Sequence, residues 1–244
     1  ENPNIEITSL ADIPAGTGLG SSGSFSTALI KGVKTYLRQQ VSQEEIAKEA
    51  CVIEIEKLKE PIGKQDQYIS AIGGVTSFAF HKDDSVQHSP LNLGSGALNK
   101  LEDHLLLFFT GFSRNASDIL KDQNDQTIVN NSEMIKNLHY VKNLGYQSKE
   151  ALENGDIDGF GHIMHEHWLV KKSRSKGMSN EHINNWYEIA LKNGALGGKV
   201  VGAGGGGFLL FVANDPYLLR GAMKDQGLKE VRFSFDFEGT KLIS

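Results

Sequence analysis

One stretch restricts the fold of this chain more than any other: PAGTGLGSSGSFSTAL, from Pro14 to Leu29. Four glycines and a cluster of hydroxyl side chains stand directly before a long segment with the apolar spacing of a helix. Glycines allow backbone N–H groups to turn toward one point, where the helix start adds about half a positive charge. Such a loop suits an anion, most often phosphate, and Ser21 and Ser22 could add hydroxyl donors or a magnesium ligand. A serine-capped helix after a flexible loop is the alternative.

This loop differs from the two commonest nucleotide-binding patterns. It lacks the Gly-Lys-Ser/Thr ending of a Walker A loop, and it is not a clean Gly-x-Gly-x-x-Gly followed by an acidic residue about 20 positions later. A nicotinamide-dependent oxidoreductase would explain the glycines alone. It is disfavoured because that acidic residue and a regular βαβ order are both absent from the sequence.

Charge and cysteine content narrow the class of protein. The 25 basic and 30 acidic side chains give a net charge of −5, which argues against a nucleic-acid or membrane-surface binder. Cys51 is the only cysteine, so an intramolecular disulfide is excluded and a reducing cytoplasm is the expected compartment. No apolar run approaches the roughly 20 residues of a membrane helix. We expect a globular protein of one large domain or two lobes.

Hydrophobic periodicity predicts an α+β chain without a regular βαβ alternation. Ser42 and Glu45 form a capping box for a helix that extends to about Lys59. Further helices are expected between Asn115 and Asn193 and after Asp215-Pro216. The predicted strands are Ile5–Leu10, Gly73–His81, His104–Gly111, Lys199–Gly202, Gly206–Ala213 and Glu230–Phe237.

The helix after Ser42 carries a carboxylate on its apolar face. At about 100° per residue, Glu54 lies in the middle of the face formed by Ala47, Ala50, Cys51 and Leu58. A carboxylate on a buried face is costly unless it is paired or bound to metal. Glu54 is therefore expected to meet a cation, which is either a metal ion or a lysine or arginine.

Two further segments contain candidate site residues. In GKQDQYIS, Asp66 lies close to Lys64, which would favour its charged form. Asp66 could deprotonate a hydroxyl nucleophile as a general base, or it could be a helix N-cap. In GAGGGGFLLF, five glycines between Gly202 and Gly207 imply close backbone approach to a ligand or to another loop.

Together these segments resemble the superfamily of galactokinase, homoserine kinase, mevalonate kinase and phosphomevalonate kinase, the GHMP kinases. Its ATP-phosphate motif, Pro-x-x-x-Gly-Leu-Gly-Ser-Ser, matches Pro14 to Ser22 position for position, and GAGGGGFLLF resembles its third motif. The resemblance implies ATP and Mg²⁺ as cofactors. It assigns the metal to Glu54 and the base to Asp66, 12 positions later, and it places Gly204 and Gly205 at the substrate site. We further expect Ser22 to hold the metal with Glu54, and Lys64 either to keep Asp66 ionised or to touch the transferred phosphoryl group. The implied phosphate-binding residues are Pro14, Gly16, Gly18, Leu19, Gly20, Ser21, Ser22 and Gly23.

Within the superfamily, TGFSRNASDIL and KKSRSKGMSN most resemble the D-glycero-D-manno-heptose 7-phosphate kinases. This similarity implies phosphorylation of the anomeric hydroxyl of a heptose 7-phosphate to the 1,7-bisphosphate, for bacterial surface polysaccharides. Arg114, Lys171, Lys172 and Arg174 are candidates to bind the sugar's phosphate, although the basic cluster could also be a solvated helix end. A fucokinase- or galactokinase-like sugar kinase and a noncatalytic sugar- and ATP-binding regulator remain alternatives.

The resemblance also implies a two-lobed fold. Residues 1–100 would form part of a ribosomal-protein-S5-like N-terminal lobe, and residues 101–244 a ferredoxin-like C-terminal lobe. The family's N-terminal first motif is absent from this sequence, which opens on Glu1 rather than on a methionine. We therefore expect the chain to begin within a truncated N-terminal lobe, and no adenine-binding residues are assigned. Sugar phosphate and ATP are the expected partners, and a homodimer is an open option.

Overall fold

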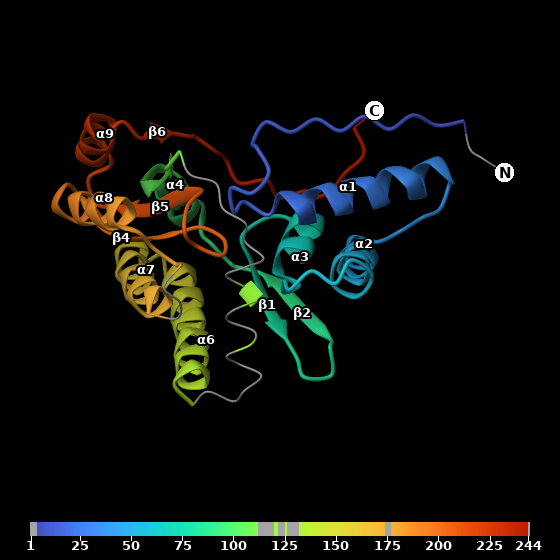
Figure 1. The fold of residues 1–244 in the computed structure, drawn as a ribbon, viewed down its shortest axis with the longest axis horizontal. Coiled ribbons are helices and arrows are strands. Elements are labelled where there is room, and N and C mark those ends of the chain that lie inside the picture. The colour runs from blue at the N-terminus through green and yellow to red at the C-terminus, as the bar shows by residue number, and fades with distance from the viewer. Residues whose placement is uncertain (1–3, 112–119, 122–124, 126–131, 174–176, 244) are drawn as a thin grey trace.

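The computed structural model describes residues 4–111, 120, 121, 125, 132–173 and 177–243. Two groups of elements lie side by side in it (Figure 1). The first group contains α1 (Ser21–Tyr36), α2 (Gln43–Cys51), the π-helical η1 (Val52–Lys57), α3 (Gln65–Ile72) and the hairpin of β1 (Thr76–Phe80) and β2 (Val86–Pro90). The second contains α4 (Ser95–His104), β3 (Leu105–Phe109), α6 (Ser132–Glu153), α7 (Ile157–Lys172), α8 (Glu181–Lys192), β4 (Ala195–Val200), β5 (Phe208–Ala213), α9 (Pro216–Asp225) and β6 (Lys229–Glu230).

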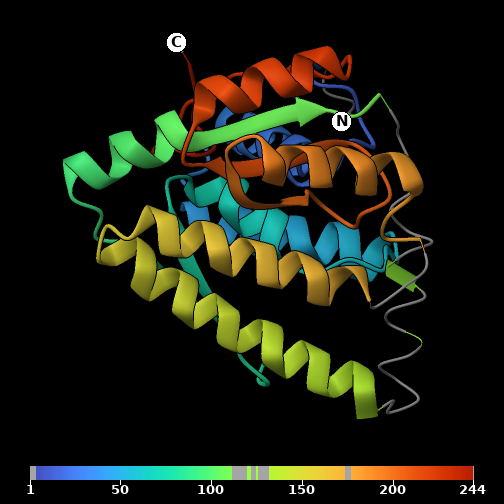
Figure 2. The ribbon, with the colours of Figure 1, turned by 90° about the vertical axis from the view of Figure 1, so that its left-hand side faces the viewer.

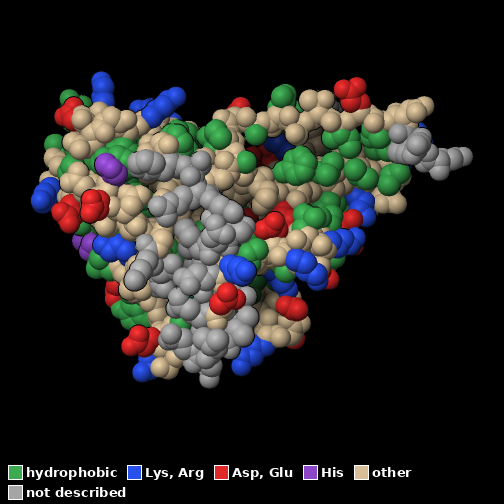
Figure 3. All heavy atoms as spheres, viewed as in Figure 1, with side chains coloured by type: hydrophobic (Ala, Val, Ile, Leu, Met, Phe, Trp, Pro, Cys, Tyr) green, Lys and Arg blue, Asp and Glu red, His purple; other side chains and the backbone are tan. Residues whose placement is uncertain are grey.

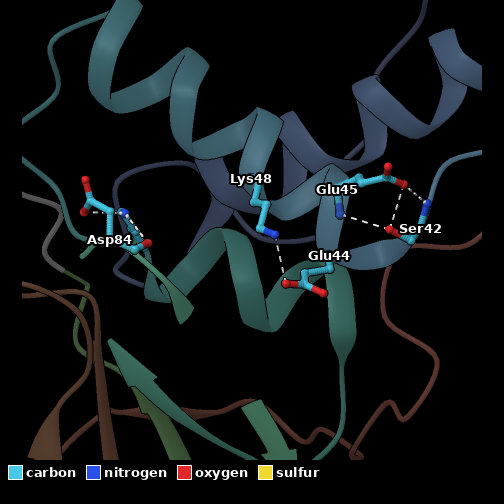
Figure 4. A network of polar contacts seen from close by, with 6 residues as sticks. Ser42, Glu44, Glu45, Lys48 and Asp84 are labelled. Atoms are coloured by element: carbon cyan, nitrogen blue, oxygen red, sulfur yellow. Dashed lines mark hydrogen bonds and ion pairs between the residues drawn. The ribbon is translucent and has the colours of Figure 1, made fainter. Parts of the chain in front are cut away.

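The first group encloses a small apolar core between α1, α2 and α3. Tyr68 of α3 is buried there and meets Phe78 of the hairpin edge-on, with ring centroids 6.2 Å apart. The predicted capping box at the start of α2 is confirmed, because Ser42 accepts from the Glu45 amide and its own amide donates to the Glu45 carboxylate (Figure 4). Local hydrogen bonds therefore fix where this helix begins.

The predicted helix to Lys59 changes its winding part-way. After Cys51 the backbone continues as the π-helix η1, whose wider turns shift the side chains away from a 100° spacing. Glu54 is still buried, with 3% of its surface exposed, but Leu58 is 64% exposed. Placing Leu58 on the buried face was therefore wrong, and the placement of Glu54 was right.

The second group is built on a four-stranded antiparallel sheet in the order β4-β5-β3-β6. This order, with helices between β3 and β4 and between β5 and β6, is the ferredoxin-like βαββαβ arrangement. Leu209 and Phe211 of β5 face α8 and α9, whereas Val212 faces α7, which is backed by α6 (Figure 2). The predicted division of the chain near residue 100 falls within α4 and remains a prediction.

Of the predicted strands, that of residues 5–10 is absent from the described part of the chain, and those of residues 199–202 and 230–237 overlap the observed β4 (Ala195–Val200) and β6 (Lys229–Glu230) only in part. Residues 5–10 are extended but pair with no described strand, and residues 231–237 lie outside β6. Their apolar alternation matches that of a strand, yet a strand also needs a neighbour to share its hydrogen bonds. After Val231 donates to Leu107, the chain leaves the sheet.

The C-terminal segment instead crosses back to the first group of elements (Figure 1). The Gly74 amide donates to the carbonyl of Asp236, and Gly239 packs against the backbone of Ala71. The Thr240 hydroxyl donates to the Ser70 carbonyl at 2.9 Å and lies 2.9 Å from the Thr27 hydroxyl. Residues far apart in sequence therefore complete the first group together.

Apolar side chains are exposed along α1 and the extended segment that precedes it. Phe25 and Val33 of α1 and Ile5 and Ile7 of the segment line one groove, and green side chains gather over this region in Figure 3. Among the described helices, none has both the length and the apolar character needed to cross a bilayer.

Candidate active site

The glycine-rich loop before α1 leads into a helix start without a side-chain cap in the described structure. Gly16, Gly18 and Gly20 have φ angles of 76°, 83° and 69°, a region in which residues with a Cβ are strained. Gly20 is the N-cap, and Ser21 is the first residue of α1. The alternative of a serine-capped helix is therefore wrong. The uncapped N–H groups and the helix dipole point to an anion site.

The second glycine-rich segment packs directly on this loop. A Cβ on Gly202 would lie 2.6 Å from the Gly18 Cα, and one on Gly207 would lie 2.0 Å from the Thr17 carbonyl oxygen. Thr17 is itself held by a hydrogen bond from its hydroxyl to the carbonyl of Pro14. The predicted close backbone approach between the two segments is therefore confirmed, and only glycine leaves room for it.

Gly204 and Gly205 continue the same turn on its other side. The Gly205 amide donates to the carbonyl of Met178 at 2.8 Å, and a Cβ on Gly204 would lie 2.8 Å from the Met178 sulfur. These contacts are with the chain itself. A substrate contact of either glycine stays a prediction.

The basic residues predicted to bind a sugar phosphate have other partners where the structure describes them. Lys171 is buried, and its ammonium donates to the carbonyls of Val200 at 3.1 Å and Gly202 at 2.5 Å. Lys172 donates to the side-chain oxygen of Asn184 at 3.4 Å. The side chain of Lys171 thus holds the glycine-rich turn, which corrects its expected position facing a ligand. Arg114 and Arg174 lie outside the described residues.

Glu54 is surrounded by neutral donors. Its Oε1 accepts from the Ser26 hydroxyl at 2.5 Å, and its Oε2 accepts from the Gln67 amide at 2.7 Å and from the Ser22 hydroxyl at 3.3 Å. No lysine or arginine of the described residues pairs with it, so the described contacts contain no salt bridge that accounts for its burial. The structure does bring Ser22 and Glu54 together.

This pair of oxygen ligands fits a magnesium ion. Mg²⁺ is usually held by one or two carboxylates together with substrate phosphates and waters, rather than by an all-protein cage. Within the described ranges, no three His, Cys, Asp or Glu side chains gather at one point. Glu54 is a buried carboxylate whose described hydrogen-bond donors are all neutral, and it lies beside a helix start of the kind that favours anions, so it supplies the negative charge that such a cation needs.

Asp66 is on the first turn of α3 and lies against the glycine-rich loop and the start of α1. Lys64 is the N-cap of that helix, so the alternative that Asp66 is the cap is wrong. A Cβ on Gly20 would lie 3.3 Å from the Asp66 Cγ, and one on Gly23 would lie 2.9 Å from its backbone carbon. Although the residue is exposed on one side, desolvation by the surrounding protein, followed by the charge of Glu54, raises the pKa of Asp66 above its ordinary value.

Lys64 does not assist Asp66 in this structure. Its ammonium forms an ion pair with Asp84 at the tip of the β1–β2 hairpin, at 2.8 Å, and also donates to the Asp84 carbonyl. Residues two apart on a helix start do not face each other, which explains why closeness in sequence was misleading. The expected Lys64–Asp66 partnership is therefore corrected, and a contact of Lys64 with phosphate stays a prediction.

Sequence analysis missed two residues of the Glu54 cluster. Ser26 stands four positions after Ser22, so both hydroxyls lie on the same face of α1 and reach the same carboxylate. The spacing of four residues between Ser22 and Ser26 could therefore have predicted that both hydroxyls reach Glu54. Gln67 comes from another helix, and no spacing rule connects it to Glu54.

Comparison with known proteins decides the family. The family model of the GHMP kinases N terminal domain matches residues 1–74, and that of the GHMP kinases C terminal domain matches residues 148–227. A D-glycero-alpha-D-manno-heptose 7-phosphate kinase of Campylobacter jejuni is 33% identical over 98% of this chain and 70% of that protein. The chain belongs to the GHMP kinase family.

Other relatives of this GHMP kinase are also named as sugar kinases. The crystal structure of a D-glycero-D-manno-heptose 1-phosphate kinase from Bacteroides thetaiotaomicron superposes with a TM-score of 0.71 at 27% identity, over 96% of this chain and 66% of that one. A bifunctional fucokinase/GDP-fucose pyrophosphorylase of Arabidopsis thaliana is 30% identical over 88% of this chain and 20% of its own length. The chain thus spans about two thirds of its heptose kinase relatives and a fifth of the bifunctional enzyme.

Proposed function

We propose that this chain carries the phosphate-, metal- and base-bearing part of an ATP-dependent sugar kinase. One observation carries the proposal: Ser22 contacts the buried Glu54, and Asp66 lies against the same helix start, which no described side chain caps. In phosphoryl transfer the protein mainly positions the reactants and stabilises charge, and these three side chains with the loop amides supply the groups required.

In the proposed mechanism, the backbone N–H groups of Gly18 to Ser22 bind the phosphates of ATP. Ser22 and Glu54 would hold Mg²⁺, which neutralises charge on the phosphates when bound. Asp66 accepts the proton of the sugar hydroxyl while that oxygen forms its bond to the γ-phosphorus. The bond between this phosphorus and the bridging oxygen breaks, and ADP leaves with the electron pair.

The environment of Asp66 suits this role. Desolvation and the neighbouring charge of Glu54 raise its pKa, and a carboxylate with a raised pKa is a stronger base. The noncatalytic regulator is disfavoured, because it would need neither a metal-binding carboxylate nor a base at this position.

For the substrate, we propose the anomeric hydroxyl of D-glycero-D-manno-heptose 7-phosphate. The names of the relatives support a heptose, while the fucokinase similarity keeps fucose as the second candidate. Arg114, Lys172 and Arg174 remain the proposed cations for the sugar's phosphate. The cytoplasmic compartment and the homodimer stay predictions.

The test uses the full-length protein that contains this chain. Phosphotransfer is measured with heptose 7-phosphate, fucose, galactose and mannose, in the wild type and in Asp66→Asn and Glu54→Gln. We expect Asp66→Asn to lower kcat about 10²- to 10⁴-fold, the usual contribution of a general base. Glu54→Gln should raise the magnesium concentration needed for half-maximal rate.

Glu56→Gln is the matched control for Glu54→Gln, because Glu56 lies on the same element and is exposed. It should retain the wild-type magnesium dependence. Near-wild-type turnover in Asp66→Asn would refute the assignment of the base. Reaction with unphosphorylated sugars only would exclude heptose 7-phosphate and its cationic pocket together.

A further inference from the structure

The magnesium ligand proposed above, Glu54, must be held in one orientation without losing its charge. Only neutral groups of the described residues donate to it: the hydroxyls of Ser22 and Ser26 and the amide of Gln67. Neutral donors fix a carboxylate while leaving its charge available, whereas a lysine or arginine in the same place would compete with a metal ion. The donor set is therefore suited to presenting Glu54 to a cation.

Gln67 is the most enclosed member of this set. Its side chain is fully buried, and its Nε2 donates to Glu54 Oε2 at 2.7 Å. The amide orientation follows from the chemistry, because an ionised carboxylate only accepts hydrogen bonds and the NH₂ group must therefore face it. The other amide atom, Oε1, is buried and has no hydrogen-bond partner among the described residues.

A buried carbonyl oxygen without a donor is rare in folded proteins and destabilises them. Here the orphan oxygen belongs to the side chain that fixes the metal-binding carboxylate, and a magnesium ion in such sites keeps several of its waters. Those waters are hydrogen-bond donors. The missing partner of Gln67 is therefore of the kind that a hydrated metal ion would supply.

The position of Gln67 links the two halves of the site. It follows Asp66 directly on α3, and its backbone nitrogen lies against α1, where a Cβ on Gly23 would be only 3.0 Å away. Its side chain reaches Glu54 on η1. Gln67 thus shares α3 with Asp66 and contacts the two other helical elements, α1 with Ser22 and η1 with Glu54.

We propose that Gln67 is the positioning residue of the metal site. Its NH₂ group orients Glu54, and its Oε1, the buried acceptor that lacks a described donor, would be available to the hydrated ion. Ser26 supports the same carboxylate through its other oxygen. This inference rests on the proposed function, since it assumes that Glu54 binds the metal.

The test measures metal binding apart from turnover. Mn²⁺ is titrated into the full-length protein saturated with a non-hydrolysable ATP analogue, and its dissociation constant is measured by calorimetry. Gln67→Met keeps the size of the side chain but removes both amide atoms. We expect Mn²⁺ binding to weaken about 10- to 100-fold, the usual effect of losing an outer-shell partner of a metal ligand. The half-saturating Mg²⁺ concentration for turnover should rise by a similar factor.

Gln65→Met is the matched control, because Gln65 is an exposed residue of the same helix turn. It should leave Mn²⁺ binding unchanged. The melting temperature of Gln67→Met without ligands is measured beside Mn²⁺ binding, because the variant removes the amide donor of Glu54, which lowers stability, together with the orphan oxygen, which raises it. A lower melting temperature with unchanged Mn²⁺ binding would show a merely structural role and overturn the proposal.

Two further variants complete the design. Gln67→Asn keeps the amide on a shorter side chain and should weaken Mn²⁺ binding as Gln67→Met does; it serves if the methionine variant does not fold. Glu54→Gln distinguishes a failure of the metal assignment of Glu54 from a failure of the positioning role of Gln67. If it leaves Mn²⁺ binding intact, the metal assignment itself fails; if it abolishes binding while the Gln67 variants bind normally, only the positioning role fails.

Discussion

The glycine-rich loop of residues 14–23 and the glycine-rich turn of residues 202–207 both contain glycines with positive φ angles, but they differ in what lies beside them. In the loop, Gly16, Gly18 and Gly20 have positive φ angles and lead into a helix start that no described side chain caps. In the turn, glycines face other backbone, with Gly202 against Gly18 and Gly207 against Thr17. The loop therefore ends at a helix start without a described side-chain cap, and the turn packs against the backbone of the loop.

We therefore expect the turn to affect mainly stability and the groups beside the loop to affect mainly activity. Changes to the turn should act first on folding, because its glycines pack closely on other parts of the chain and residues 205–207 are buried. Changes to ligand-facing groups beside the loop should act on activity and cost little stability.

The largest effect is expected from Gly207→Ala. The added Cβ would lie 2.0 Å from the Thr17 carbonyl oxygen, on a residue with a φ angle of 83°. Left-handed strain of about 1–2 kcal/mol and overpacking of about 1–3 kcal/mol together predict a loss of roughly 2–5 kcal/mol in the free energy of unfolding. Urea denaturation measures it.

Gly221→Ala is the control for this substitution. Gly221 lies within α9, and a Cβ there would meet no atom within 4 Å. Because alanine is the better helix former, this variant should gain about 0.5–1 kcal/mol. Equal stability of Gly207→Ala and the wild type would disprove the packing role of the turn.

A smaller effect is expected from Lys171→Met. The substitution removes the ammonium that donates to the carbonyls of Val200 and Gly202. Losing hydrogen bonds from a charged, buried donor should cost about 2–4 kcal/mol of unfolding free energy, measured by denaturation. Lys172→Met, whose partner Asn184 lies at 3.4 Å, should stay within about 0.5 kcal/mol of the wild type.

The Lys171 variant also discriminates between two roles. If its stability were unchanged while the KM for the sugar phosphate rose, Lys171 would bind substrate, as the sequence predicts. The turn would then contribute to activity as well as to stability.

The smallest change in stability is expected from Asp66→Asn. The pKa of Asp66 is raised, so the folded protein disfavours its charged form and holds the proton to higher pH than the unfolded chain does. Stability is therefore lost as pH rises from the unfolded-state pKa, about 3.9, through the folded-state pKa, and the penalty persists at neutral pH.

The asparagine side chain of this variant carries no such charge. The melting temperature of Asp66→Asn at pH 7 should equal or exceed that of the wild type even though catalysis is lost, and the difference should shrink toward acidic pH. A clearly lower melting temperature at pH 7 would mean that Asp66 supports the fold rather than the reaction.

Local chemistry explains which parts of the fold could be predicted from sequence. The start of α2 follows from Ser42 and Glu45, and the start of α9 from Asp215 and Pro216, because each boundary is fixed within a few residues. Residues 5–10 alternate as a strand does, but no described strand pairs with them. A strand depends on a distant partner that the local pattern does not contain.

The candidate site shows the same limit. The burial of Glu54 was predictable from its spacing to Ala47, Ala50 and Cys51, and its need for a polar partner follows from the cost of burying a carboxylate. The π-helical turn that exposes Leu58 has no such local signature. The pairing of Lys64 with Asp84, 20 positions away, and the approach of Gln67 to Glu54 depend on how separate elements pack. These tertiary contacts could therefore not be predicted from local sequence patterns.

The returning C-terminal segment has a consequence for how the chain is made. Thr27 is near the beginning of the chain, yet its neighbour Thr240 is synthesised 213 residues later. At roughly 5–20 residues per second, that delay is about 10–40 s. Until Thr240 is made, α1 and α3 lack one of their packing partners on the ribosome, so elements that are synthesised early are among the last to reach their final surroundings.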